Sequence, residues 1–190
     1  MKRRAELEEE TRRRIAASAA ELHETVGPAR TSISAVAELA GVRRSTVYRH
    51  FPDETALFEA CSSHWRAANP PPDAQRWQAI ADPDERLQTA LAELYAYYRR
   101  TQRMYTGLLR DETLVPALAR QLAGFYAFQA AVAEVLMAGR GARGRGRKRI
   151  RGAIGHALAF PTWRSLAVDQ GLSDDEAVAL MTALVDAASA

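Results

Sequence analysis

Hydrophobic residues recur at steps of three and four along most of the chain, the spacing of amphipathic helices. The helix predicted from Thr11 to Val26 has a buried stripe formed by Ile15, Ala19, Leu22 and Val26, and Gly27-Pro28 ends it. Further helices are predicted at 83–100, 102–109, from Pro116 to Gly139, at 148–170 and at 173–188. Because no segment alternates hydrophobic and polar residues as a strand does, the predicted fold class is all-α.

The segment 32–51, SISAVAELAGVRRSTVYRHF, predicts two short helices joined by a tight turn. Ser32 is a suitable N-cap, and Gly41 ends the first helix where a positive φ costs least. Val47 and Phe51 lie four residues apart on the inner side of the second helix. A small contact residue at Ala37, the turn glycine and a hydrophobic anchor are the positions that a helix-turn-helix requires.

The other positions of the second helix are hydrogen-bond donors that remain on its outer side. A short helix rich in such donors suits insertion into the major groove of DNA. The residues are Arg43, Arg44, Ser45, Thr46, Tyr48, Arg49 and His50.

Three motifs in this region resemble the DNA-binding part of the TetR family of bacterial transcriptional regulators. They are AxxAGV at 37–42, TVYRHF at 46–51 and FP-x-x-x-x-L at 51–57. The resemblance implies about nine helices in an N-terminal three-helix helix-turn-helix DNA-binding domain at 1–51, a connecting helix at 52–68, and a helical domain for ligand binding, regulation and dimerisation at 76–190.

The resemblance also implies how DNA is contacted. Arg43, Arg44 and Ser45 are expected to contact bases, since arginine bonds guanine bidentately. The phosphate contacts are expected from Thr31, Thr46, Tyr48 and His50. At one position the chain departs from the family, which usually has a lysine where this sequence has Glu54. A carboxylate suits a helix N-terminus but repels the DNA backbone.

The chain has 190 residues, of which 47% are hydrophobic, and a net charge of +3. The first 51 residues hold ten Lys/Arg and seven Asp/Glu, which favours nucleic acid at that end. Residues 140–151 hold seven basic residues and no acidic one, and 139–149 is interpreted as a flexible loop. This loop is either solvated, in non-specific contact with DNA, or a site for an acidic partner.

Cysteine content and hydrophobicity place the protein in the cytoplasm. Cys61 is the one cysteine, so no internal disulfide forms, as in a reducing compartment. No stretch of about eighteen hydrophobic residues predicts a membrane span, and the charged N-terminus is unlike a signal peptide.

No motif indicates an enzyme, and no cofactor or metal is expected. The four histidines lack metal-ligand spacing, and Cys61 with His64 is interpreted as a core cysteine beside a surface histidine.

The resemblance instead implies a cavity in the C-terminal part for an unidentified small molecule, which we expect to be hydrophobic or aromatic. The candidate lining residues are aromatic or hydrophobic, with one histidine: Tyr95, Tyr98, Met104, Tyr105, Leu108, Phe125, Phe128, His156, Phe160 and Trp163.

The last two helices carry more hydrophobic surface than one neighbour can cover, and the family pairs them across a two-fold axis. A homodimer is therefore expected, with two recognition helices about 34 Å apart on a near-palindromic operator. The predicted function is a repressor released from double-stranded operator DNA by the small molecule.

Two alternatives remain open. One is a DNA-binding regulator without a small ligand, controlled by a protein partner or by its abundance. The other is a helical ligand- or partner-binding module whose DNA binding is weak or lost, and Glu54 favours it.

Overall fold

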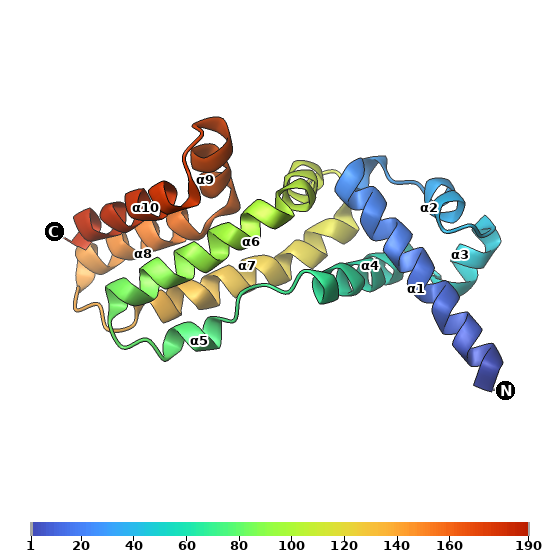
Figure 1. The fold of residues 1–190 in the computed structure, drawn as a ribbon, viewed down its shortest axis with the longest axis horizontal. Coiled ribbons are helices and arrows are strands. Elements are labelled where there is room, and N and C mark those ends of the chain that lie inside the picture. The colour runs from blue at the N-terminus through green and yellow to red at the C-terminus, as the bar shows by residue number, and fades with distance from the viewer. Residues whose placement is uncertain (1, 190) are drawn as a thin grey trace. The chain divides into compact units, whose positions relative to one another are not determined.

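The computed structural model describes residues 2–189, and every regular element in that range is helical, which confirms the all-α class. The described residues form ten α-helices, one more than the approximate number expected, and Figure 1 shows how they follow one another along the chain. A short 3₁₀-helix at Pro28–Arg30 and a π-helix at Ser165–Asp169 complete the set. The α-helices are α1 (Lys2–Thr25), α2 (Ile33–Leu39), α3 (Arg44–His50), α4 (Glu54–Ala68), α5 (Ala74–Gln78), α6 (Pro83–Asp111), α7 (Pro116–Met137), α8 (Gly144–Leu158), α9 (Phe160–Arg164) and α10 (Asp174–Ser189).

The chain divides into two compact units. The first contains Met1–Pro70 and Arg103–Gly124, and the second contains Pro71–Gln102 and Phe125–Ala190. The first unit thus combines α1 to α4 with the last part of α6 and the first part of α7. Both α6 and α7 contribute residues to each unit, so two continuous helices connect them.

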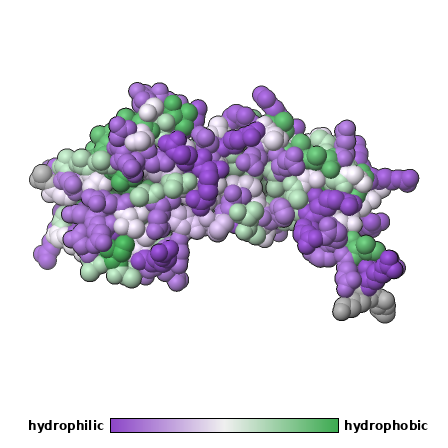
Figure 2. Space-filling model, viewed as in Figure 1, coloured by the Kyte–Doolittle hydropathy of each residue, from purple (hydrophilic) through white to green (hydrophobic). Residues whose placement is uncertain are grey.

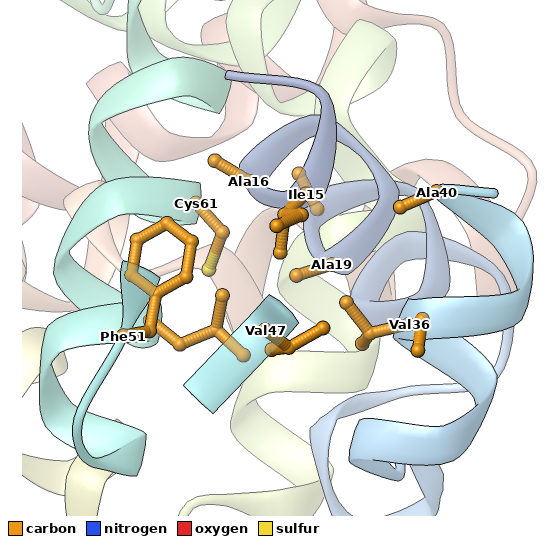
Figure 3. Packing of buried hydrophobic residues seen from close by; sticks show 11 residues of the cluster. Ile15, Ala16, Ala19, Val36, Ala40, Val47, Phe51 and Cys61 are labelled. Carbon is orange, nitrogen blue, oxygen red and sulfur yellow. The ribbon is translucent and has the colours of Figure 1, made fainter. Parts of the chain in front are cut away.

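The core of the first unit holds the helix-turn-helix together. Figure 3 shows Ile15 of α1, Val36 of α2 and Val47 of α3 pointing toward one another, and all three are fully buried. Phe51 and Cys61 extend this cluster toward α4. Each fully buried aliphatic side chain contributes about 1.5–3 kcal/mol. A helix of seven residues does not form alone in water, so α3 depends on this core.

Predicted helix boundaries are confirmed where a side chain or a turn residue sets them. Ser32 Oγ accepts a hydrogen bond from Ala35 N at 3.1 Å, and Gly41 follows α2 with φ +64°. A capping box begins the helix expected at 173–188, since Glu176 accepts from the Ser173 N–H and Ser173 Oγ accepts from Glu176 N.

The chain breaks between α8 and α9 at Ala159, whose backbone is extended, and Pro161 lies in the first turn of α9. Proline has no N–H, so it cannot bond the Ala157 carbonyl one turn earlier. Tyr95 Oη donates to that carbonyl at 2.9 Å instead, and Tyr98 Oη donates to the Leu158 carbonyl at 2.7 Å. Two tyrosines of α6 thereby satisfy the carbonyls exposed at the end of α8.

Two expectations about helix extents are wrong, and one helix was not expected. The segments 83–100 and 102–109 form one helix, because residues 83–111 contain no interior proline and Thr101 is buried with its hydroxyl bonded to the Tyr97 carbonyl. The segment 139–149 is a loop only before Gly144, where α8 starts. Helix α5 was not predicted, and it is held by Trp77, which is buried and donates to Glu93 Oε2 at 3.0 Å.

On the surface shown in Figure 2, hydrophilic residues predominate and hydrophobic ones lie in separate patches, one of them over α9. Within residues 2–189, no helix combines the length and the hydrophobicity that crossing a membrane demands.

A buried histidine connects α1 to α4 inside the first unit. His23 stacks on Phe58, and its Nδ1 lies 3.6 Å from Cys61 Sγ. Burial lowers the pKa of His23 from 6.5 to about 4, and the nearby Asp111 only partly opposes this. Burial likewise raises the pKa of the Cys61 thiol to about 12, so the thiol is unreactive at neutral pH.

Because His23 is neutral in the folded protein, its burial favours folding above pH 6.5 and loses that contribution as the pH falls toward 4. Each unit of pKa difference corresponds to about 1.4 kcal/mol, so roughly 2 kcal/mol should disappear between pH 7 and pH 5. Urea unfolding at both pH values measures it. A His23→Phe protein keeps the other histidines and should lose clearly less stability over this range; an identical loss in both proteins would contradict the burial argument.

Candidate DNA-binding surface

Helix α3 is fixed on one side and exposed on the other. Val47 is 0% exposed, whereas Tyr48 is 50% exposed. Arg44, Ser45 and Arg49 are exposed with it, and Thr46 is half-buried. The expected DNA-contacting residues of α3 therefore lie on its outward side, opposite the Val47 anchor.

The three residues expected to contact bases lie together at the start of α3. Arg43 is the N-cap residue, with extended backbone, and Arg44 and Ser45 occupy the first turn. Arg44 Nη2 lies 3.5 Å from Tyr48 Oη, one turn later on the same side. None of the three carries an acidic partner in the described structure, so the arginines are available to an external acceptor.

The first and last of the expected DNA-contacting residues, Thr31 and His50, are less accessible. Thr31 is half-buried, and its hydroxyl donates to the Gly27 carbonyl at 2.9 Å. Thr31 can donate to a DNA phosphate only if this hydrogen bond breaks. His50 is also half-buried, and its Nε2 is buried without a hydrogen-bond partner among residues 2–189. A phosphate contact by His50 requires its other ring nitrogen or a rotation.

Arg12 on α1 holds the end of α3, a role that sequence reasoning missed. Its Nη1 donates to the His50 carbonyl at 2.8 Å, and its guanidinium lies 4.5 Å from the centre of the Phe51 ring. The carbonyl at a helix C-terminus attracts a cation, and the aromatic ring face does the same. The sequence carried no signal, because Arg12 is one of three adjacent arginines.

A hollow of about 260 Å³ lies beside α3 in the first unit. The N-terminal ends of α2 and α4 meet Tyr48 there, and both Thr31 and Glu54 line it. Its hydrophobic lining comes from Pro28, Ile33, Val36, Leu57 and Phe58. Asp53 caps α4 by accepting from Ala56 N at 2.8 Å, whereas Glu54 is exposed in the first helical turn. Glu54 thus shares a surface with two residues expected to contact phosphates.

The end of α6 fixes the segment that precedes α2. Asp111 is buried and accepts from Ala29 N at 3.0 Å, and the Arg110 guanidinium holds the pKa of that carboxyl below its usual range. Gly27, at φ +93°, leaves space for this pair, because a Cβ there would collide with Arg110 and Asp111. The sequence did not single out Asp111.

The residues expected to line a ligand cavity separate into two groups. Tyr95, Tyr98, Phe160 and Trp163 are fully or almost fully buried in the second unit. Tyr98 contacts the others, with ring centres 5.3 Å from Phe160 and 5.9 Å from Trp163. Burial raises the pKa of both tyrosines, so their hydroxyls stay protonated hydrogen-bond donors.

The remaining candidates are more dispersed. Phe125 and Phe128 are half-buried on α7. His156 is exposed on α8 rather than enclosed among hydrophobic residues, with its Nδ1 3.3 Å from Thr162 Oγ1. Met104, Tyr105 and Leu108 belong to the first unit, where Tyr105 packs edge-on against Trp65.

Asp174 anchors the aromatic group and was not singled out from the sequence. It accepts both Arg99 Nε and Nη2 at 2.7 Å and the Trp163 indole N–H at 2.9 Å. The Arg99 guanidinium is the main cause that lowers the pKa of Asp174. Within the part of the chain that the structure describes, no group of three or more His, Cys, Asp or Glu could hold a metal ion.

The comparison with protein families decides the identity of the helix-turn-helix unit. Residues 15–61 match the family described as bacterial regulatory proteins, tetR family. The helix-turn-helix unit is therefore similar to the N-terminal, DNA-binding part of TetR-family regulators. The match covers α1 from Ile15, the whole helix-turn-helix and the first half of α4, and it includes every expected DNA-contacting residue.

Solved structures show the same fold over nearly the whole chain. A protein named as a TetR-family transcriptional regulator from Mesorhizobium loti has a TM-score of 0.64 at 20% identity, over 95% of this chain and 96% of its own. Another named so, from Rhodococcus sp., has a TM-score of 0.62 at 18% identity, over 96% and 100%. Among curated proteins, none matches the sequence.

The hollow beside α3 makes the role of Glu54 testable. Replacing Glu54 by Gln removes a negative charge beside the expected phosphate contacts, and two unit charges 4 Å apart in water interact by about 1 kcal/mol. We expect the Glu54→Gln protein to bind DNA about fivefold more tightly at low salt, measured by fluorescence anisotropy. The control is Glu59→Gln, an exposed carboxylate on the same helix but outside the hollow. Equal affinities for both variants would refute the role of Glu54.

Proposed function

We propose that this chain is a regulator of the TetR type, a homodimeric transcriptional repressor that a small hydrophobic or aromatic molecule releases from its operator. The observation that carries the DNA-binding part is the α3 surface. Arg43, Arg44 and Ser45 project from a helix whose opposite side is fixed by the fully buried Val47. A short, rigid helix with free guanidinium groups at its N-terminal end suits base contacts in the major groove.

The dimer is supported by the two sides of α10. Its Ala177, Met181 and Val185 are buried within the chain, where α10 packs on α8. On its other side Leu180 is 47% exposed and Leu184 is 39% exposed. A second copy of this chain would cover these leucines, and a two-fold interface would pair each leucine side with its own equivalent. Such a dimer supplies the two recognition helices that a near-palindromic operator needs.

Ligand control is supported by the continuity of α6. Tyr95 and Tyr98 lie in its second-unit part, within the buried aromatic group, and Asp111 lies at its end, bonded to the segment before α2. A ligand that displaces the aromatic side chains shifts α6, and the shift reaches Ala29 through Asp111. The ligand acts only through its different affinity for the DNA-bound and released states, typically about 1–3 kcal/mol.

A second candidate function is a ligand-binding module that has lost DNA binding. The specific observation in its favour is the exposed Glu54 beside Thr31 and Tyr48. The free arginines of α3 favour the regulator, because a module without DNA has no use for three adjacent exposed donors at a helix start.

Replacing Arg44 by Ala separates the two functions. Each bidentate base contact is worth about 1–3 kcal/mol, and a dimer loses two, so specific binding should fall by roughly 30-fold or more. Gel-shift titration against DNA from around the protein's own coding region measures this. The control is Arg66→Ala, an exposed arginine on α4 outside α3.

The module hypothesis is supported instead if the folded wild-type dimer forms no specific complex at low salt. The regulator is supported if wild type and Arg66→Ala bind specifically and Arg44→Ala does not.

A further inference from the structure

The start of α8 carries a dense group of positive charges. Residues 140–151 include seven basic side chains and no acidic one. The first and the last of them, Arg140 and Arg151, interact with other residues of the second unit. Arg140 donates to the Pro83 carbonyl at 2.8 Å and lies 3.0 Å from Asp84 Oδ1, and Arg151 pairs with Glu134 of α7.

The five basic residues between them are exposed, and their side chains have neither an acidic partner nor a hydrogen bond in the described structure. We call them the α8 basic cluster: Arg143, Arg145, Arg147, Lys148 and Arg149. All except Arg143, which is the N-cap, lie within the helix rather than in a flexible loop. Arg145, Lys148 and Arg149 are three and four residues apart and so project from the same side of α8.

This arrangement is unfavourable for the isolated helix. Cations three or four residues apart repel one another. The N-terminal end of a helix also carries a partial positive charge, and the first turn of α8 contains no acidic residue to offset it. A bound polyanion removes both penalties, so the cluster has more to gain from an anionic partner than an ordinary mixed-charge surface.

The chemistry of the cluster favours a phosphodiester backbone. Four of the five residues are arginines, whose planar groups bond phosphate bidentately. The large exposed hydrophobic residues lie outside positions 139–151, so the cluster lacks the hydrophobic anchor typical of protein interfaces.

We propose that the α8 basic cluster binds the backbone of double-stranded DNA without reading its sequence. This extends the DNA-binding function proposed above and in part rests on it, since a regulator bound to DNA holds further DNA at high local concentration. Each neutralised phosphate releases counterions, so the cluster should make binding to any duplex more dependent on salt.

The test compares two triple variants of the full-length protein on a non-operator duplex. The first is Arg145→Gln/Lys148→Gln/Arg149→Gln. The control is Arg66→Gln/Arg76→Gln/Arg103→Gln, which removes the same charge from exposed positions elsewhere. Fluorescence anisotropy over a range of KCl concentrations gives the slope of log affinity against log salt. Three lost phosphate contacts should reduce the slope by about 2.7 for each subunit whose cluster contacts the duplex, and the control should keep the wild-type slope.

A conservative variant separates lost contacts from a damaged helix. Arg145→Lys/Arg149→Lys keeps the charge and should keep most of the wild-type slope. Equal slopes for wild type and the first triple variant would overturn the proposal. A second result would also overturn it: the triple variant binds DNA normally but has lost binding to phosphatidylglycerol vesicles or to polyglutamate. The partner of the cluster would then be a lipid surface or an acidic protein.

The outcome is independent of the operator. If the protein forms no sequence-specific complex, the function proposed above fails, yet the slope on the non-operator duplex still tests the cluster. If Arg44→Ala abolishes the specific complex and leaves that slope unchanged, the two surfaces act separately.

Discussion

The candidate DNA-binding surface depends on the burial of Val47. Helix α3 has seven residues, too few to be stable in water by its own hydrogen bonds. Its conformation comes from contacts between Val47, Val36 and Ile15, which join three helices at one point. Arg12 adds a second constraint at the far end of α3 through the His50 carbonyl. The exposed side of α3 can therefore consist almost entirely of polar groups, because none of them is needed for folding.

A second constraint links the helix-turn-helix to the rest of the chain. The buried Asp111 bonds Ala29, and Gly27 provides the space for it. Since α6 continues from this carboxylate to Tyr98 and Tyr95, a single helix contains both the anchor of the DNA-binding unit and the centre of the aromatic group. The tyrosine hydroxyls in turn bond the Ala157 and Leu158 carbonyls at the end of α8. The bend in the C-terminal helices and the position of α6 thus depend on the same hydrogen bonds.

Much of the fold was predictable because local signals and hydrophobic spacing agreed. Ser32, Gly41, Ser173 and Pro161 act through their own backbone or their nearest neighbours, so their effects were visible in the sequence. The continuity of α6 was missed because polar Arg100 and Gln102 interrupt its hydrophobic stripe, while buried Thr101 continues it. The helical conformation of Gly144 to Arg149 was missed because a segment rich in glycine and arginine is typical of a loop. The buried residues that hold this helix, Ile150 and Ile154, come only later in the sequence.

The candidate sites were predictable to different degrees. The helical repeat and the buried Val47 together determine which side of α3 is exposed. The exposure of Arg44 and Tyr48 could therefore be predicted. The aromatic residues could be expected to be buried, but their division between two units could not. Arg12, Asp111 and Asp174 act through partners 38, 82 and 75 residues away, and no local pattern reveals such pairs.

The most direct test of the account is to let the purified protein select binding sites from random double-stranded DNA and to sequence the bound fraction. The account predicts enrichment of a near-palindrome whose half-sites are centred about 10 bp apart, or a multiple of that, because two copies of α3 enter successive turns of the major groove. Enrichment of no sequence by a folded dimer would contradict the assignment of Arg43 to His50 as a sequence-reading surface.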